Sequence, residues 1–330
     1  MAMASCCRTI DASDVPDGWS TCEVAYRASL DGPPFWLPLD IAQSLPSCAR
    51  PGFDFIPEQS KIQPMPFVWV SRADAEAAAE RVHGAAGLAE RRAAAAARVH
   101  AACAASASAN GTLILLHGTG DSGLSLGAAV EGAGLFEGAR ARGLALRCPD
   151  APLRRLGFWG DAEVRVWHDR RCSQPRADDG AVRWRDSARD VAAACARLAR
   201  LARRARAPVF VVGHSMGGVL ALHAAARVRA LAGVACFAAW LPADSPTFAR
   251  LRRRGRAAAP RVLLAYGARD DMMPVEKQRR TAARLEADAR DGGAPFECCV
   301  LRDTDHHVTA AHVGALFRWI DEAVALGARV

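Results

Sequence analysis

A serine flanked by glycines gives the strongest chemical signal in the sequence. Residues 208–218 read Pro-Val-Phe-Val-Val-Gly-His-Ser-Met-Gly-Gly, a β-branched run that leads directly into Gly-x-Ser-x-Gly. Such a run is typical of a buried parallel strand, and the residues that follow it are compatible with a helix. Between strand and helix, Gly213 and Gly217 leave room for a sharp turn that exposes the hydroxyl of Ser215. The pattern predicts a nucleophile that attacks an acyl carbon.

A serine hydroxyl becomes a good nucleophile only when a base takes its proton and an acid orients that base. Asp270 and Asp271 follow one predicted strand, and His306 and His307 follow the next and last one. Serine, acid and histidine therefore occur in the chain order that a turn of this type requires. Only one member of each doublet can take part, and the spacing alone leaves both choices open.

The negative oxygen that forms during acyl transfer needs two backbone N–H groups directed at it. We expect one from Met216, the residue after the nucleophile, and the other from the loop after the first strand. That loop reads Leu-Leu-His-Gly-Thr-Gly-Asp-Ser-Gly over residues 115–123, and its glycines allow the backbone to approach a substrate closely. A phosphate-binding loop is the competing interpretation. The absence of a following lysine and the glycine spacing both exclude it.

Apolar strand patterns alternate with helical patterns from Thr112 onward. This alternation predicts an α/β fold, with a mostly parallel sheet covered by helices on both faces and functional sites at the carboxyl ends of the strands. The predicted strands are 112–116, 144–148, 209–212, 234–238, 262–266 and 296–301, and the predicted helices lie near 124–142, 183–206, 217–229, 245–256, 275–291 and 310–327.

The 330 residues are enough for one large domain and an appendage. We expect three segments. Residues 1–72 form an N-terminal extension of unknown type that is rich in proline and tryptophan. Residues 73–109 form an alanine-rich helix, with Gly84 and Gly87 as interruptions, followed by a linker. Residues 110–330 form the catalytic α/β domain.

The net charge of +8 comes mainly from arginines, and the whole sequence is biased toward alanine and arginine. We interpret the positive charge as a result of this compositional bias rather than as a nucleic-acid-binding surface.

The eleven cysteines are scattered without Cys-x-x-Cys or zinc-type spacing, which predicts free thiols in a reducing compartment and no metal site. Neither a secretory signal nor a membrane span is visible, so a cytoplasmic location is expected. Cys6 and Cys7 leave open lipid attachment near the N-terminus.

Several motifs together resemble the acyl-protein thioesterase and lysophospholipase/carboxylesterase family of α/β-hydrolases. Thr119 and Met216 are most similar to its lysophospholipase-like branch. The resemblance covers about residues 112–325, and residues 1–110 match nothing in this family. The matching motifs are His117–Gly123 (His-Gly-Thr-Gly-Asp-Ser-Gly), Cys148–Pro152 (Cys-Pro-Asp-Ala-Pro), Trp167-His168-Asp169, Gly213–Gly218 and Trp240-Leu241-Pro242.

The resemblance assigns a role to particular residues. It selects Asp270 and His306 from the two doublets, which gives a triad with Ser215. It implies that Thr119 supplies the second oxyanion N–H beside that of Met216. It also places Trp167, Trp240 and Leu241 near the acyl site, and it implies that no metal or organic cofactor is needed.

The function expected from these features is hydrolysis of acyl thioesters or esters. S-palmitoylated proteins, lysophospholipids and small carboxylic esters are the implied substrates. A transient contact with a membrane surface is compatible with them, and the sequence leaves the oligomeric state open. The alternative is a non-catalytic binding protein that keeps the fold and uses its N-terminal extension for interaction.

Overall fold

The computed structural model of the chain describes residues 85–104, 109–155, 163–172, 184–270 and 272–326, together with five short strands nearer the N-terminus. The chain divides into two compact units, one of Met1–Ala96 with Leu153–Arg165 and one of Ala97–Pro152 with Val166–Val330. In the described part of the chain, no helix has both the length and the apolar character needed to cross a bilayer.

The first unit contains a five-stranded sheet of order β1-β4-β5-β2-β3 and a two-stranded antiparallel pair, β8-β9. Only the β2–β5 pairing in the five-stranded sheet is parallel. These strands are β1 (Arg8–Thr9), β2 (Val24–Ala28), β3 (Phe35–Leu37), β4 (Pro46–Ala49), β5 (Val68–Val70), β8 (Leu153–Arg155) and β9 (Glu163–Arg165).

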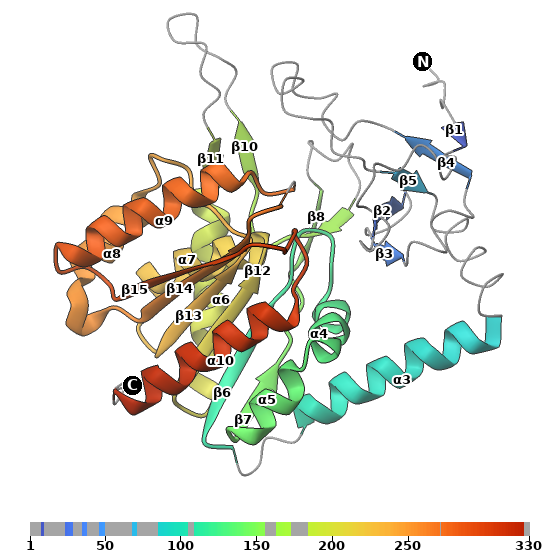
Figure 1. The fold of residues 1–330 in the computed structure, drawn as a ribbon, viewed down its shortest axis with the longest axis horizontal. Coiled ribbons are helices and arrows are strands. Elements are labelled where there is room, and N and C mark those ends of the chain that lie inside the picture. The colour runs from blue at the N-terminus through green and yellow to red at the C-terminus, as the bar shows by residue number, and fades with distance from the viewer. Residues whose placement is uncertain are drawn as a thin grey trace, which may run out of the picture. The chain divides into compact units, whose positions relative to one another are not determined.

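The second unit is built on a six-stranded sheet of order β15-β14-β13-β12-β6-β7 (Figure 1). Every pairing in it is parallel. All six predicted strands are present in this sheet, so the α/β prediction is confirmed. Their bounds are β6 (Gly111–Leu116), β7 (Leu144–Arg147), β12 (Val209–His214), β13 (Gly233–Phe237), β14 (Arg261–Gly267) and β15 (Phe296–Leu301).

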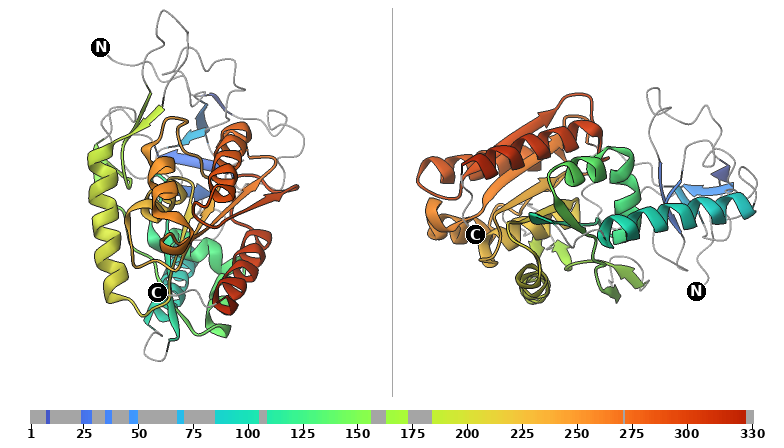
Figure 2. Two further views of the ribbon diagram at one scale, coloured as in Figure 1. Left: turned by 90° about the vertical axis from the view of Figure 1, so that its left-hand side faces the viewer. Right: turned by 90° about the horizontal axis from the view of Figure 1, so that it is seen from below.

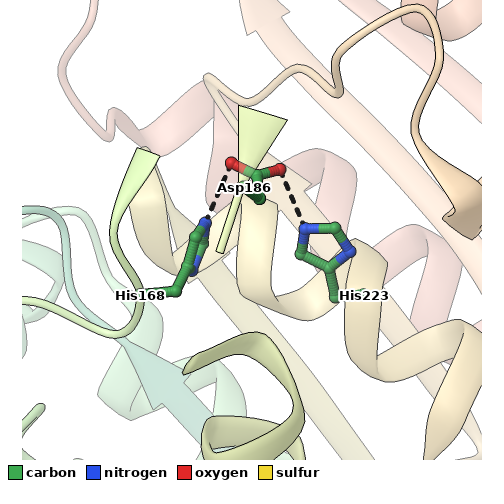
Figure 3. A group of neighbouring side chains, drawn as sticks. All are labelled: His168, Asp186 and His223. Carbon is green, nitrogen blue, oxygen red and sulfur yellow. Dashed lines mark hydrogen bonds and ion pairs between the residues drawn. The ribbon is translucent and has the colours of Figure 1, made fainter. Parts of the chain in front are cut away.

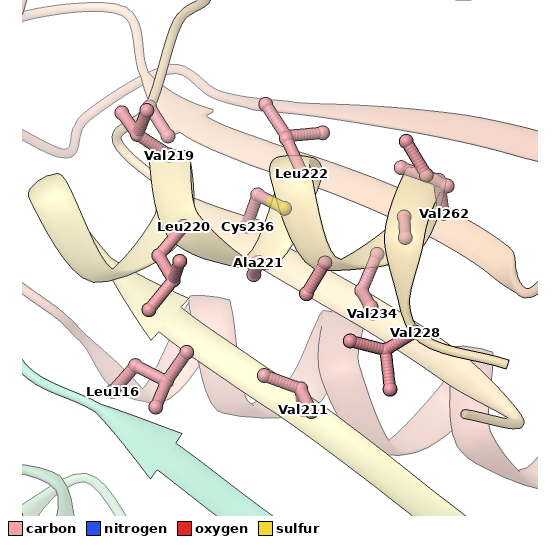
Figure 4. Close-up of a cluster of buried hydrophobic side chains, with 14 of the residues drawn as sticks. Leu116, Val211, Val219, Leu220, Ala221, Leu222, Val228, Val234, Cys236 and Val262 are labelled. Atoms are coloured by element: carbon pink, nitrogen blue, oxygen red, sulfur yellow. The ribbon is translucent and has the colours of Figure 1, made fainter. Parts of the chain in front are cut away.

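Helices cover both faces of this sheet because successive residues of each strand point to opposite sides. Leu113 and Leu115 of β6 pack with residues of α4, α5 and α10, whereas Ile114 and Leu116 pack with residues of α6 to α9. Figure 2 shows helices on both sides of the sheet, and Figure 4 shows Leu116 in the second of these clusters. The helices are α3 (Ala85–Ala104), α4 (Gly123–Gly132), α5 (Leu135–Ala141), α6 (Ala188–Arg204), α7 (Met216–Arg227), α8 (Pro246–Ala258), α9 (Val275–Arg290) and α10 (Ala310–Ala325).

The structure differs from the sequence prediction in three helical regions. The helix expected over 124–142 is two helices, because Gly134 between them adopts φ +84°, which ends the helical path. Gly87 does not interrupt the alanine-rich helix but lies within α3. The region expected to begin a helix at residue 183 instead starts with a strand, β11 (Trp184–Asp186), which pairs antiparallel with β10 (Arg170–Cys172).

Candidate active site

Ser215 occupies a strained turn between the end of β12 and the start of α7. Its backbone has φ 55° and ψ −120°, a conformation that costs a non-glycine residue about 1–3 kcal/mol. Its N–H donates to the carbonyl of Phe237 at 2.9 Å, which holds the turn against the neighbouring strand. A Cβ at Gly213 or Gly217 would lie 2.1 Å from a backbone oxygen, so only glycine fits on either side of the turn.

Asp270 and His306 form a buried pair at the carboxyl ends of the two neighbouring strands β14 and β15. The Nδ1 atom of His306 lies 3.1 Å from each carboxylate oxygen of Asp270. Three further N–H groups donate to the same carboxylate. They are the backbone amides of Met272 (3.1 Å) and Met273 (2.7 Å) and the side-chain amide of Gln278 (3.0 Å). The carboxylate is therefore held in one orientation toward the imidazole.

The structure distinguishes the two neighbouring histidines. His306 is directed at Asp270, whereas Nδ1 of His307 lies 2.9 Å from Oδ1 of Asp305, which also accepts the backbone N–H of His307 at 2.8 Å. The imidazole of His306 is almost fully buried, and that of His307 is partly exposed. Asp271, the other member of the acidic doublet, lies outside the described residues.

His214 connects the serine turn to the histidine loop. Its Nε2–H donates to the carbonyl of His306 at 2.7 Å, and the two rings lie 4.7 Å apart between centroids. Burial lowers the pKa of His214 well below its usual value, so the ring stays neutral. Among the described hydrogen bonds, none joins Ser215 Oγ to the imidazole of His306. Such bonds tighten in many enzymes only when substrate binds.

The loop of residues 117–123 passes directly beside the serine. A Cβ at Gly118 would lie 3.3 Å from Cβ of Ser215 and 3.8 Å from its Oγ. Thr119 follows in this loop, and Met216 is the first residue of α7. Within the described chain, the backbone N–H of neither Thr119 nor Met216 donates to a protein group. Both amides are therefore free to bind a negative oxygen.

Two sequence motifs brace this loop. Nε2 of His117 accepts the backbone N–H of Ala151 at 2.9 Å, and the carbonyl of His117 accepts the indole N–H of Trp167 at 2.8 Å. At the end of the loop, the N–H of Gly123 donates to Oδ1 of Asp150 at 2.8 Å. The motifs around Asp150 and Trp167 thus position the loop beside Ser215.

The three residues expected near the acyl group are buried. Trp167 and Leu241 pack in the core on the α6–α7 face of the sheet, and the N–H of Leu241 donates to Oγ1 of Thr281 at 3.0 Å. The ring of Trp240 lies under two cationic groups, the guanidinium of Arg170 at 4.2 Å and the ammonium of Lys277 at 4.5 Å. The place of these three residues beside an acyl group stays a prediction.

His168, Asp186 and His223 form a second buried polar cluster (Figure 3). Asp186 lies 3.3 Å from Nε2 of His168 and 3.0 Å from Nε2 of His223, and Arg170 donates to both of its oxygens at 2.6 and 3.2 Å. Burial alone would raise the pKa of Asp186, but Arg170 and the two histidines hold it well below its usual range. Three ligand-type atoms lie within 4.8 Å of one another. However, Arg170 already donates to both oxygens of this carboxylate, and its positive charge opposes a cation at the same place.

Sequence reasoning missed Gln278, His214 and this second cluster. Gln278 lies in α9 with no motif around it, and only its fully buried amide beside Asp270 reveals its role. His214 is part of the Gly-x-Ser-x-Gly motif, but the motif does not specify the residue at that position. His168 belongs to the Trp167-His168-Asp169 motif, which gives no indication of the partners of its imidazole.

The sequence and the fold were compared with known proteins. Residues 113–325 match the family model described as "Alpha/beta hydrolase family". Sequence comparison with curated proteins gives no match. The structure is similar to acyl-protein thioesterase 2 of Zea mays (TM-score 0.53, 22% identity, 66% of this chain and 94% of that chain). It is also similar to SOBER1 of Arabidopsis thaliana (TM-score 0.50, 20% identity, 65% and 99%). These likenesses establish the fold. Because the matched residues make up more than half of this chain, the chain belongs to the alpha/beta hydrolase family.

Proposed function

We propose that the protein is a serine hydrolase that cleaves acyl esters or thioesters. The observation that carries this proposal is the buried Asp270–His306 pair, which is bonded through His214 to the strained turn at Ser215. A turn with this backbone strain persists only where the surrounding structure enforces it, and such strain is concentrated at functional sites.

In this proposal Ser215 Oγ attacks the acyl carbon while Nε2 of His306 takes its proton. Asp270 accepts the Nδ1–H of His306, which keeps the proton off Nε2 and stabilises the imidazolium that forms. The N–H groups of Thr119 and Met216 bind the tetrahedral oxyanion. Each donor of this kind contributes roughly 3 kcal/mol to the transition state in comparable sites. His306 then protonates the leaving group and activates water for deacylation.

The proposed substrates are S-acylated proteins, lysophospholipids and small carboxylic esters. Support comes from the sequence motifs described above and from the fold shared with a protein named as an acyl-protein thioesterase. A cavity of about 320 Å³ borders the Asp186 cluster, because Asp186 and His223 line it together with further residues of α6, α7 and the segment that leads into α8. None of the proposed catalytic residues lines it, so we do not assign the acyl chain to it. The six cysteines whose side chains the structure describes are free thiols, which supports the proposal of a cytoplasmic location.

An active-site probe tests the proposal. A fluorophosphonate that modifies activated serines is expected to label the wild-type protein and to leave Ser215→Ala unlabelled. Ser245→Ala is the matched control. Ser245 caps α8, where its Oγ accepts the N–H of Thr247, and it should keep full labelling. Circular dichroism checks that both variants are folded. Labelling that persists in Ser215→Ala would refute Ser215 as the nucleophile, and a folded wild type that resists the probe would favour the non-catalytic alternative.

A second assay defines the substrate class. Matched p-nitrophenyl esters and acyl thioesters of two to sixteen carbons would be compared by kcat/KM. A preference for long chains supports a lipid-linked substrate, and a preference for acetyl or butyryl groups supports a small-ester hydrolase. A preference for thioesters over oxyesters of the same chain length supports a thioesterase. Equal inactivity toward every member of both series would contradict the proposal.

A further inference from the structure

Two thiols face one another at the edge of the six-stranded sheet. Cys103 lies near the C-terminal end of α3, and Cys148 directly follows β7, the outer strand of that sheet. Their sulfurs are 3.8 Å apart, and both residues are partly exposed. A disulfide needs a sulfur–sulfur distance of about 2.05 Å, so the two sulfurs must approach one another by about 1.8 Å for the bond to form.

The surroundings of the pair favour ionisation of one thiol. The hydrogen bond from Cys148 lowers the pKa of Cys103 to about 7, with a further contribution from the positive charge of Arg147. Arg147 is held in place because its guanidinium donates to the carbonyl of Cys103 at 2.7 Å. The same thiol–thiol hydrogen bond and burial raise the pKa of Cys148. Because the thiolate is the reactive form and the cationic Arg147 is bonded to Cys103, this thiol is taken as the one that attacks.

The other described cysteines lack this combination. Burial raises the pKa of Cys195 to about 12 and also raises that of Cys236, which is fully buried. Cys298 and Cys299 are adjacent in β15, so their side chains point to opposite faces of the sheet. Burial raises the pKa of both.

The pair joins the end of α3 to the end of β7, which also meet where Arg147 donates to the carbonyl of Cys103. The end of α3 is held by Val99, whose methyl groups lie against Gly127 of α4, and by an exposed ion pair between Arg98 and Glu131 at 2.7 Å. Exposed ion pairs contribute little to stability. The carbonyl of Cys148 contacts the loop beside the serine, since a Cβ at Gly123 would lie 2.0 Å from it.

We propose that Cys103 and Cys148 form a reversible disulfide when the protein meets a peroxide. The bond fastens the end of α3 to the end of β7, and it closes a ring that contains β6, the 117–123 loop, α4 and α5. This is a modification site separate from the proposed catalytic residues, and it does not depend on the proposed hydrolase activity.

The reaction with hydrogen peroxide balances without another reagent. The Cys103 thiolate attacks one peroxide oxygen, a sulfur–oxygen bond forms, the oxygen–oxygen bond breaks, and hydroxide leaves as water after taking a proton. Cys103 is now a sulfenic acid. The Cys148 sulfur attacks the Cys103 sulfur and gives up its proton, the sulfur–oxygen bond breaks, and a second water leaves. The two thiols lose two electrons, which reduce one peroxide to two waters.

Peptide mapping tests the proposal directly. The reduced full-length protein is treated with a small excess of hydrogen peroxide, quenched with N-ethylmaleimide and digested with trypsin. Cleavage at arginine releases residues 99–140 and 148–154, each with a single cysteine. The expected product is these two peptides joined, with separation on adding dithiothreitol. Recovery of both peptides in maleimide-modified form, while other cysteines have been oxidised, would overturn the proposal.

Two variants test whether the disulfide depends on Cys103. Cys103→Ser is expected to abolish the joined peptide, whereas the matched control Cys298→Ser, at another partly accessible thiol, should leave it unchanged. Oxidation should also raise the Tm of the wild type by about 5–10 °C, as expected for closing a ring of this length, and should not raise that of Cys103→Ser. A joined peptide without a Tm increase would refute the fastening role of the bond. An equal increase in the Tm of oxidised Cys103→Ser would show that oxidation of other thiols causes the stabilisation.

Discussion

Replacing Asp270 with asparagine changes one atom of the proposed triad and tests the role of its carboxylate. Oδ1 accepts the backbone N–H groups of Met272 and Met273, Oδ2 accepts the amide of Gln278, and both oxygens lie 3.1 Å from Nδ1 of His306. Asparagine offers one acceptor oxygen in place of two. If that oxygen stays on the two backbone donors, the NH₂ group faces His306.

An NH₂ group that faces Nδ1 of His306 can only donate to it. Nδ1 must then lose its proton, and Nε2 must carry one instead, so Nε2 can no longer accept the proton of Ser215. The corresponding substitution in a serine protease triad lowers kcat about 10⁴-fold through the wrong tautomer. At about 1.4 kcal/mol per factor of ten, this loss corresponds to about 5.5 kcal/mol of transition-state stabilisation. We expect a loss of this order in Asp270→Asn.

Steady-state hydrolysis of a p-nitrophenyl ester measures the effect, with circular dichroism as the check of folding. Asp305→Asn is the matched control because Asp305 pairs with His307 in the same loop through an Nδ1 contact of 2.9 Å. Its kcat/KM should stay within about threefold of the wild type, because its carboxylate bonds His307 and not the proposed base His306. The reasoning fails if Asp270→Asn keeps more than a tenth of the wild-type kcat, or if Asp305→Asn suffers the larger loss.

Three further outcomes are expected. His306→Ala should lower kcat at least 10³-fold and His307→Ala far less, because His306 contacts the proposed acid Asp270 whereas His307 pairs with Asp305. Comparable kinetic losses in the two variants would contradict this assignment. Gln278→Met keeps the side-chain volume but removes a donor to the triad carboxylate. It should lower kcat about tenfold with little change in KM, and a change in KM alone would argue against a positioning role. Burial lowers the pKa of His223 from 6.5 to about 4, so the unfolded chain binds a proton below pH 6.5 that the folded protein does not. His223 should therefore contribute up to about 3 kcal/mol to the fall in the free energy of unfolding between pH 6.5 and pH 4, as measured by urea titration. His223→Gln should flatten this dependence and the exposed His100→Gln should not; identical slopes in all three proteins would refute the argument.

The parallel sheet and the serine turn are readable from sequence because their determinants are local. A buried strand needs a short apolar run, and the turn at Ser215 needs glycines where a Cβ would meet backbone oxygens. The six strands follow from such runs. Errors occurred where one residue or a distant partner decides the outcome. Gly134 splits a continuous apolar pattern through its positive φ, and β11 forms by pairing with β10.

The candidate site also has a part that the sequence predicts and a part that only the fold decides. The residue types and their order along the chain indicated a serine, an acid and a histidine, because the chemistry requires those types at successive strand ends. Spacing could not select between His306 and His307, which differ by one position in one loop. Only the folded loop decides which imidazole meets Asp270, because that contact joins residues brought together by the pairing of β14 with β15. The same holds for Gln278, and for Cys103 and Cys148, whose neighbours are set by packing between distant segments.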